Sequence, residues 1–261
     1  MKKIGLALGA GGAKGISHIA FLQALDELGV RPAVIAGTSI GAVIGGFYAA
    51  GVSGARLEQL LKEIGFRDLY KIVLDLSILS QSAIFKGQGV EDFLTREIPA
   101  RTFEELEIPF KVVATKFWDR GQMVFESGNL TNAIRASMAM PAVFEPVCLN
   151  DMVLVDGGAV NPLPYDLIQS QCDLTIAIDV SGEKTYAPGN PVPNMVESIL
   201  STFQIMQASI VEAKRTLSPP DIYVKPALTN IRVLDFYRYK EILAGVQEEV
   251  ERFKDTLKNL L

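Results

Sequence analysis

Residues 33–41 read AVIAGTSIG, in which a short apolar strand passes through a tight turn into an apolar segment, Ile40–Ala50, with the character of a helix. The turn contains the pattern G-x-S-x-G, formed by Gly37, Ser39 and Gly41. A nucleophilic serine stands on such a turn so that its hydroxyl clears the backbone, and the flanking glycines are needed because strand and helix approach closely there. The amides at the start of the helix direct partial positive charge towards the serine. The stretch predicts Ser39 as a nucleophile, with a structural glycine-rich turn as the alternative.

A second glycine-rich turn, Gly9–Gly15, lies between a predicted strand, Lys3–Leu8, and a predicted helix, Ile16–Leu28. Glycines at such a junction expose consecutive backbone N–H groups, which can hold an anion at the N-terminus of a helix. One use of these groups is an oxyanion hole, in which the amides of Gly11 and Gly12 face the negative charge of a tetrahedral intermediate. A tight turn without a ligand is the alternative.

The same turn does not match the common nucleotide-binding motifs. A P-loop requires Ser or Thr after its lysine, whereas Lys14 is followed by Gly15 and Ile16. A dinucleotide fingerprint requires glycine at its first, third and sixth positions, and either Ala10 or Lys14 occupies one of these in each reading frame. We therefore expect no nucleotide and no other cofactor.

The third turn, Asp156-Gly157-Gly158, follows a predicted strand and supplies a candidate base for Ser39. An α/β-hydrolase triad has the order Ser, Asp or Glu, His, and no histidine follows Ser39. The lone His18 precedes Ser39 in a predicted helix, where a core or packing role is expected. Asp156 is the alternative base, because Gly157 and Gly158 would leave room for substrate and let the carboxylate approach Ser39. An Asx-type turn without catalytic meaning is the other interpretation.

Strands and helices alternate through the first half of the chain, which predicts an α/β fold with a mainly parallel sheet. After Tyr186 apolar residues recur at helical spacing, which predicts helices with core or dimer-packing faces. We expect one large domain, in which residues 1–185 form the main unit and residues 186–261 a helical extension packed on it. The other predicted strands are 33–36, 109–115, 122–126, 152–155 and 174–180, and the other predicted helices are 57–64, 90–97 and 131–138.

The composition excludes several classes of protein. The 261 residues are 49% hydrophobic and carry a net charge of −5 without a basic stripe, so nucleic acid is not an expected partner. Cys148 and Cys172 match no metal-ligand spacing, and a single histidine excludes a multi-histidine metal site. No metal is expected, and two separate thiols suggest a reducing, cytoplasmic setting.

Residues 32–55 contain no charged residue and are long enough to span a bilayer. Six glycines interrupt this stretch, and the turn at Ser39 lies within it. A buried strand followed by a buried helix explains the same residues, and we expect that arrangement rather than a membrane span. The apolar start of the chain is likewise expected to be a buried strand and not a signal peptide, because Lys14 follows and a cleavage context is lacking.

Taken together, the three turns resemble the patatin-like phospholipase family, in particular its bacterial members related to the catalytic domain of neuropathy target esterase. The resemblance runs from about Lys3 to Val180. It rests on the glycine loop with Lys14-Gly15, Ser17-His18-Ile19, Gly37-Thr38-Ser39-Ile40-Gly41, Arg135-Ala136-Ser137-Met138-Ala139-Met140-Pro141, Val155-Asp156-Gly157-Gly158 and Asn161-Pro162-Leu163-Pro164.

The resemblance implies a three-layer α/β/α fold and a catalytic Ser–Asp dyad without histidine, acting as a phospholipase A, lysophospholipase or carboxylesterase on lipid esters. Ser39 matches the nucleophile, Asp156 the base, and Gly11 and Gly12 the oxyanion amides. Ala10 stands where many members have Gly or Ser, and a donor amide survives that change. A small-ester or thioester hydrolase and a non-catalytic adaptor with the same fold remain alternatives, and the C-terminal helices are a candidate homo-oligomer surface.

The chemistry that the resemblance implies needs a stronger base than an ordinary carboxylate. Ser39 Oγ would attack an ester carbonyl while Asp156 accepts its proton, and an unperturbed aspartate has a pKa of about 3.9. Burial would raise that pKa, so we expect a mostly apolar pocket around the dyad, which also suits acyl chains. The apolar segment Ile72–Phe85 is a candidate acyl-facing or membrane-facing element, with an ordinary packed connection as the alternative, and peripheral contact with the inner face of a membrane is expected.

Overall fold

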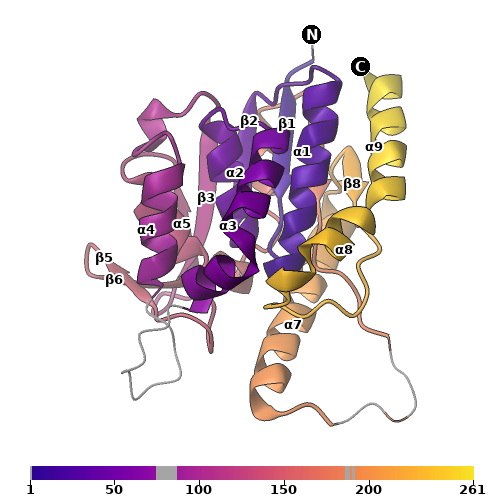
Figure 1. Ribbon diagram of the computed structural model, residues 1–261. Helices are drawn as coiled ribbons and strands as arrows, with labels where there is room; N and C mark the ends of the chain where they lie inside the picture. The colour runs from indigo at the N-terminus through magenta and orange to yellow at the C-terminus, as the bar shows by residue number, and fades with distance from the viewer. Residues whose placement is uncertain (1, 75–86, 186–188, 190–191) are drawn as a thin grey trace.

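The computed structural model describes residues 2–74, 87–185, 189 and 192–261 (Figure 1). These residues form a central sheet with the strand order β5-β6-β3-β2-β1-β7-β8, and β4 pairs with β3 beside this path. The run from β3 to β8 is parallel, whereas β4, β5 and β6 join it in antiparallel pairs. The strands are β1 (Ile4–Leu8), β2 (Val34–Thr38), β3 (Phe110–Lys116), β4 (Gly121–Phe125), β5 (Val147–Leu149), β6 (Met152–Asp156), β7 (Leu174–Ile178) and β8 (Ile222–Val224).

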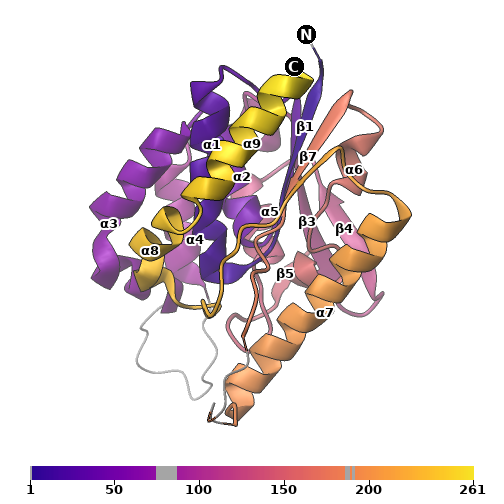
Figure 2. The same ribbon diagram turned by 90° about the vertical axis from the view of Figure 1, so that its right-hand side faces the viewer.

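Helices cover both faces of the sheet and give three layers (Figure 2). Alternate residues of a strand point to opposite faces. Leu6 and Leu8 of β1 belong to the larger core with α1, α2 and α9, whereas Ala7 packs with residues of α6 and α7. The helices are α1 (His18–Glu27), α2 (Ile40–Ala49), α3 (Gly54–Leu74), α4 (Gln88–Glu97), α5 (Leu130–Ser137), α6 (Asp166–Gln169), α7 (Met195–Leu217), α8 (Tyr239–Ala244) and α9 (Gln247–Leu260), with the 3₁₀ turns η1 (Gly12–Ser17), η2 (Phe103–Glu105), η3 (Gly157–Ala159) and η4 (Phe236–Arg238).

The strand register places β2 and β6 end to end along one edge of β3. Both β2 and β4 pair with Val112 and Val113, so these two strands lie on opposite edges of β3. β6 pairs with the following residues from Ala114 onward, where β4 still occupies the other edge, so β6 shares the edge of β2. Thr38 at the end of β2 pairs with Val113, and Asp156 at the end of β6 pairs with Ala114. The sheet therefore delivers the last residues of β2 and β6 to the same point.

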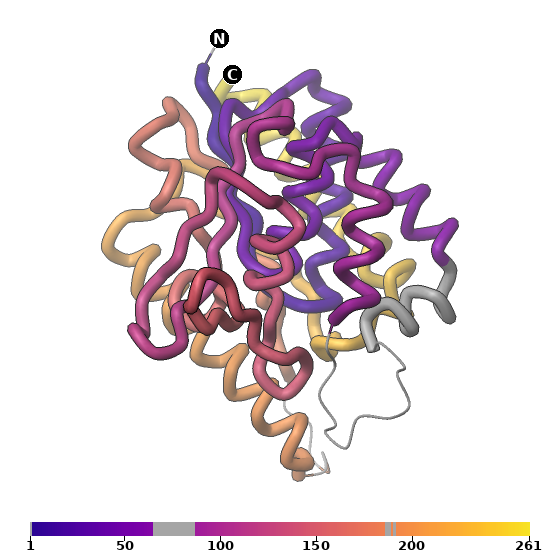
Figure 3. The backbone as a smooth tube through the Cα atoms, turned by 90° about the vertical axis from the view of Figure 1, so that its left-hand side faces the viewer, coloured from indigo at the N-terminus to yellow at the C-terminus, as the bar shows by residue number. Residues whose placement is uncertain are grey.

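The predicted α/β fold with a mainly parallel sheet is confirmed. The sequence did not predict β5 or β8, which are only three residues long, and α3 extends beyond its predicted range of 57–64. Most of the candidate acyl-facing or membrane-facing segment Ile72–Phe85 lies outside the described residues. The tube in Figure 3 shows the helices of the larger layer from the other side of the molecule.

The C-terminal residues contribute more than helices. β8 extends the sheet beside β7, so part of the expected helical extension belongs to the central layer. The apolar stripe of α8 and α9 is core: the buried residues are Ile242, Val246, Val250, Phe253 and Leu257. The stripe of α7 is different, because Val196, Ile199 and Met206 are 49%, 44% and 52% exposed. Of the two roles expected for this stripe, core packing does not hold for these three residues, because α7 turns Gln207 and Val211 towards the protein instead. The dimer-packing role stays a prediction.

No single helix within the described residues is long and apolar enough to cross a membrane. The charge-free stretch contributes to one pair that passes the same test together, α2 with residues 54–64 of α3, and this pair is bent by 120° at the break.

Candidate active site

Ser39 stands on a strained turn between β2 and α2. Its backbone angles are φ 55° and ψ −121°, a conformation that a side chain adopts only where the surrounding structure enforces it. Position 41 requires glycine because a Cβ there would overlap the Leu8 carbonyl oxygen at the end of β1. Position 37 requires it because a Cβ there would lie 2.5 Å from the carbonyl oxygen of Gly41. The Ser39 amide donates to Ser137 Oγ at 2.9 Å. These contacts hold the serine in the position that the sequence motif predicts.

Asp156 lies next to Ser39, at the end of β6. Ser39 Oγ donates to Asp156 Oδ2 at 2.7 Å, and the Gly158 amide donates to Asp156 Oδ1 at 2.7 Å. The carboxyl is 1% exposed, and burial raises its pKa to about 6, against the opposing effect of these two hydrogen bonds. A Cβ at Gly157 would overlap the Val113 carbonyl oxygen, and one at Gly158 would overlap the Gln207 side chain. The turn thus requires glycine at position 157, where the overlap is with backbone, and it presents one carboxylate oxygen to the serine.

The glycine loop after β1, residues 9–15, lies beside Ser39. The Ala10 amide donates to Pro162 O and the Ala13 amide to Val233 O, each at 2.8 Å. Between them, the Gly11 and Gly12 amides have no acceptor within the part of the chain that the structure describes. Gly12 has φ 60° and lines a cavity together with Ser39, and a Cβ on it would lie 2.5 Å from Val233 O. Two amides without acceptors beside a serine hydroxyl are the arrangement that an oxyanion hole requires.

Lys14 and Gly15 support this loop from behind. Lys14 is 2% exposed and its Nζ donates to Ile231 O at 3.4 Å. Burial, followed by repulsion from Lys184, lowers the pKa of Lys14 to about 8. A Cβ on Gly15 would overlap the side chain of Ile40, the residue after Ser39. Both residues therefore hold the loop in place and do not contact the Ser39 hydroxyl.

His18 is not positioned to act as the base. It is fully buried, and its Nε2 donates to Gly9 O at 2.9 Å. This hydrogen bond places the proton of the neutral ring on Nε2, while Nδ1 has no partner among the described residues. Burial lowers the pKa of His18 to about 4. The ring packs under the glycine loop, in agreement with its predicted structural role.

A small apolar cavity of about 50 Å³ opens at Ser39. The predicted apolar pocket is therefore present at Ser39. Asp156 does not line it, and the raised pKa of Asp156 comes from its own burial. The residues that line the cavity are Gly12, Ser39, Ile40, Met138, Met140, Val143, Phe144, Val233, Leu234 and Phe236.

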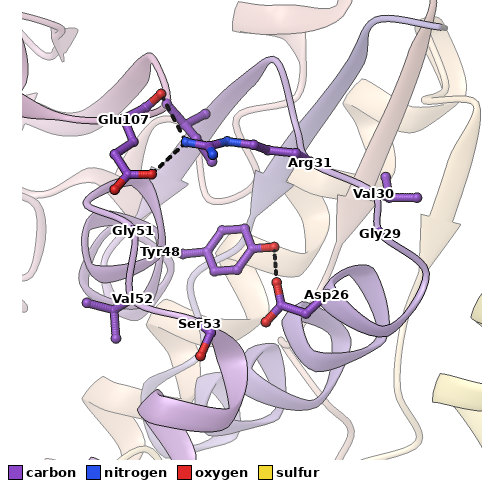
Figure 4. A pocket seen from close by; sticks show the side chains of 10 residues that line it. Asp26, Gly29, Val30, Arg31, Tyr48, Gly51, Val52, Ser53 and Glu107 are labelled. Carbon is purple, nitrogen blue, oxygen red and sulfur yellow. Dashed lines mark hydrogen bonds and ion pairs between the residues drawn. The ribbon is translucent and has the colours of Figure 1, made fainter.

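A larger cavity of about 320 Å³ lies at the end of the strands opposite to Ser39 (Figure 4). Arg31 precedes β2 and Glu107 precedes β3, whereas Ser39 follows β2. In this cavity Tyr48 Oη donates to Asp26 Oδ1, and Arg31 forms an ion pair with Glu107, each at 2.7 Å. The carboxylates are occupied by these partners, and burial raises the pKa of the Tyr48 hydroxyl above its usual range, which disfavours its use as a nucleophile.

Side chains that bind metals are dispersed in the described residues. No group of three or more His, Cys, Asp and Glu is close enough there to hold a metal ion. Cys148 is exposed and Cys172 is half-buried, and both thiols are free.

The C-terminal residues support the site in a way that the sequence did not reveal. Lys214 Nζ on α7 binds Asn161 Oδ1 and Asp166 Oδ1, and Thr38 Oγ1 donates to Asn161 O at 2.8 Å. The loop that precedes α6 is thereby fastened to the end of β2. One signal for this role was present in the sequence. Lys214 lies four residues after Ile210, on the same face as the apolar stripe of α7, and a charged residue at such a position indicates a specific partner.

The sequence of the chain is similar to those of known proteins. The family model described as "Patatin-like phospholipase" matches residues 6–168. An uncharacterised NTE family protein of Mycobacterium tuberculosis is 36% identical over 203 residues, 76% of this chain and 55% of that protein. Lysophospholipase NTE1 of Kluyveromyces lactis is 27% identical over 264 residues, 92% of this chain and 18% of that protein. The chain thus spans about half the length of its mycobacterial relative.

Solved structures support the fold. VipD of Legionella pneumophila superposes with a TM-score of 0.53 at 15% identity, over 95% of this chain and 66% of that chain. At this identity the likeness concerns the fold alone.

Proposed function

Because the chain belongs to the patatin-like phospholipase family, we propose that it is a serine hydrolase that cleaves the acyl ester bonds of lipids with Ser39 and Asp156. The observation that carries the proposal is the 2.7 Å hydrogen bond from Ser39 Oγ to Asp156 Oδ2 at an apolar cavity. Lysophospholipase NTE1, which is named for hydrolysis of a lysophospholipid, supports a lipid ester as the substrate.

The reaction follows from the positions of these groups. Ser39 Oγ attacks the ester carbonyl and transfers its proton to Asp156 Oδ2, which the raised pKa suits for this task. The carbonyl oxygen becomes an oxyanion and accepts hydrogen bonds from the Gly11 and Gly12 amides. The proton on Asp156 then passes to the leaving alcohol. In the second half, Asp156 takes a proton from water, and the resulting attack on the acyl-enzyme releases the fatty acid and restores Ser39.

A hydrolysis panel tests the proposal. The purified chain is assayed on phospholipid, lysophospholipid and short p-nitrophenyl esters, with and without vesicles. Hydrolysis that falls at least about 1,000-fold in both Ser39→Ala and Asp156→Asn supports the dyad. Turnover confined to short esters would favour the small-ester or thioester hydrolase, and no turnover of any ester would favour an adaptor that keeps the fold.

A matched variant separates chemistry from folding in this panel. Ser209→Ala removes an exposed hydroxyl on α7 that donates only to Ile205 O at 3.0 Å. It is expected to hydrolyse every ester at the wild-type rate. Asp156→Asn with full esterase activity would mean that the assigned base is wrong.

We further propose that the end of the molecule at which β2 and β3 have their carboxyl ends contacts a lipid surface. Phe117 and Trp118 follow β3 at this end, as Ser39 follows β2. They are 50% and 74% exposed, and their ring centroids lie 4.8 Å apart. Lys116 precedes them, and Asp119 and Arg120 follow, so this segment carries one net positive charge. Exposed aromatic rings beside cations suit the interface of a bilayer that contains anionic lipids. The exposed N-terminal end of α7, with Met195, extends beyond the same end of the molecule (Figures 1 and 2).

The single tryptophan makes this contact measurable, because Trp118 is the only one in the chain. Vesicles of phosphatidylglycerol are expected to shift its emission to the blue and to sediment the protein, and vesicles of phosphatidylcholine to do so less. Trp118→Ser should reduce sedimentation, whereas Leu217→Ser at the far end of α7 should not. Unshifted emission with every vesicle contradicts the contact. A shift that depends on protein concentration and not on vesicles would assign this surface to a homo-oligomer.

A further inference from the structure

A second apolar space adjoins the cavity at Ser39. This groove, about 100 Å³ in volume, is lined by apolar side chains of α1, α2, α3 and α4, including Val43, Leu60 and Phe93. Ile40 and Phe236 line both the groove and the Ser39 cavity. These two side chains therefore form the boundary between the two spaces.

The two boundary residues are held differently. Ile40 follows Ser39 and packs against Gly15, so its side chain is fixed by the glycine loop. Phe236 is half-buried and begins η4, at the end of the segment Leu228–Phe236, here called the strap. The strap is tied to the glycine loop through the Ala13 amide and Val233 O at 2.8 Å. Phe236 is thus a side chain from the C-terminal residues placed at the exit of the catalytic cavity.

We propose that the acyl chain of the substrate runs from Ser39 between Ile40 and Phe236 into the groove, so that Phe236 determines the preferred acyl length. This inference rests on the proposed function and assigns a chain-binding site to the described residues of α1 to α4. The groove has almost no polar surface, which suits methylene groups and disfavours a polar head group. The head group of the substrate then lies on the other side of the ester, towards solvent.

The volumes of the Ser39 cavity and of the groove indicate how long an acyl chain must be to reach the groove. A water-sized group needs roughly 10–15 Å³ of such a cavity. On this scale the Ser39 cavity takes about four carbon atoms and the groove about eight more. A butyryl group stays within the first space, whereas a dodecanoyl group needs both. The ratio of kcat/KM for dodecanoate to that for butyrate therefore reports on the passage.

Three variants measure this ratio with p-nitrophenyl esters. Phe236→Ala widens the passage and should raise the ratio about tenfold, because a long chain then enters the groove with less steric hindrance while a butyryl group does not need the passage. Leu60 lines the groove but not the Ser39 cavity, so Leu60→Trp fills only the groove and should lower the ratio about tenfold. Tyr237→Ala, a neighbouring ring that is 52% exposed, serves as the matched control and should leave the ratio unchanged. Ratios within about twofold of wild type for both Phe236→Ala and Leu60→Trp would overturn the inference.

A binding measurement is independent of turnover. Titration of dodecanoate into Ser39→Ala protein, followed by calorimetry, should show binding that weakens about tenfold when Leu60→Trp is added. Equal affinity in both proteins, or no binding, would overturn the acyl path even if ester hydrolysis depends on Ser39. If binding responds to Leu60→Trp but no ester is hydrolysed, the groove stands and the proposed function fails.

Discussion

Ser39 and Asp156 reach each other because β2 and β6 end at consecutive positions on the same edge of β3. Thr38 pairs with Val113 and Asp156 with Ala114, and Ser39 Oγ then lies 2.7 Å from Asp156 Oδ2. The two strands run in opposite directions, so their carboxyl ends meet although 117 positions separate the two residues. The distance between the hydroxyl and the carboxylate is thus set by backbone pairing within the sheet. The sheet itself therefore brings the Asp156 carboxylate within hydrogen-bond distance of the Ser39 hydroxyl.

The raised pKa of Asp156 predicts that this residue weakens the fold near neutral pH. An aspartate with a pKa of about 6 when folded and 3.8 when unfolded contributes stability below about pH 4 that is lost as the pH rises through 6. The difference corresponds to about 3 kcal/mol. Asp156→Asn keeps the shape without the charge, so it should unfold less readily than wild type above about pH 7.

Chemical denaturation of the wild type and Asp156→Asn between about pH 4 and pH 8 measures this effect. The stability gain of the variant should grow with pH and level off above the folded pKa of about 6. A gain that is constant across this range would mean that the carboxyl titrates as an ordinary exposed group. Hydrolysis by the wild type should rise over the same interval, because only the ionised carboxyl accepts the Ser39 proton.

Gly12→Ala is predicted to damage the oxyanion loop. The position has φ 60°, and the new Cβ would lie 2.5 Å from Val233 O, so the loop or the strap must shift. Loss of one oxyanion donor typically lowers kcat by about 100-fold or more. Gly29→Ala is the matched control, because it has φ 64° but no atom within 4 Å of a Cβ. Steady-state kinetics with thermal unfolding should show lost kcat only at Gly12, and equal kcat in both variants would contradict the assignment.

Ser137→Ala is predicted to loosen the turn that carries the nucleophile. Ser137 is fully buried and its Oγ accepts the hydrogen bond of the Ser39 amide. Removing the acceptor leaves that amide unpaired, which costs about 1–3 kcal/mol. We expect kcat to fall about tenfold with little change in KM, because substrate contacts are preserved. A change in KM alone would mean that Ser137 affects substrate binding and not the position of Ser39.

The sequence predicted the parts of the site that depend on local backbone geometry. Gly37, Gly41, Gly157 and Gly158 mark turns in which chains approach closely, and such turns leave a signature in the residues themselves. The α/β class and the mainly parallel sheet followed from the alternation of strands and helices. Because these features are encoded within a few residues, they could be read without coordinates.

Features that depend on distant pairing could not be read in this way. β8 has three residues and gains its stability from β7, so its own sequence is too short to predict a strand. The exposed stripe of α7 looked like a core face because periodicity does not reveal which side meets the protein. Phe236 and Val233 reach the site only through the path of the strap, 194 residues after Ser39 in the case of Val233. A local sequence pattern does not predict a contact between residues so far apart in the chain.

The most direct test of the Ser39–Asp156 pair is the rate at which a fluorophosphonate labels the protein, with the modified residue located by mass spectrometry of peptides. We predict labelling on Ser39 in the wild type, none in Ser39→Ala, and a rate at least about 100-fold lower in Asp156→Asn. Labelling of Ser39 at the full rate in Asp156→Asn, or labelling of another residue in the wild type, would contradict the assignment of the nucleophile and its base.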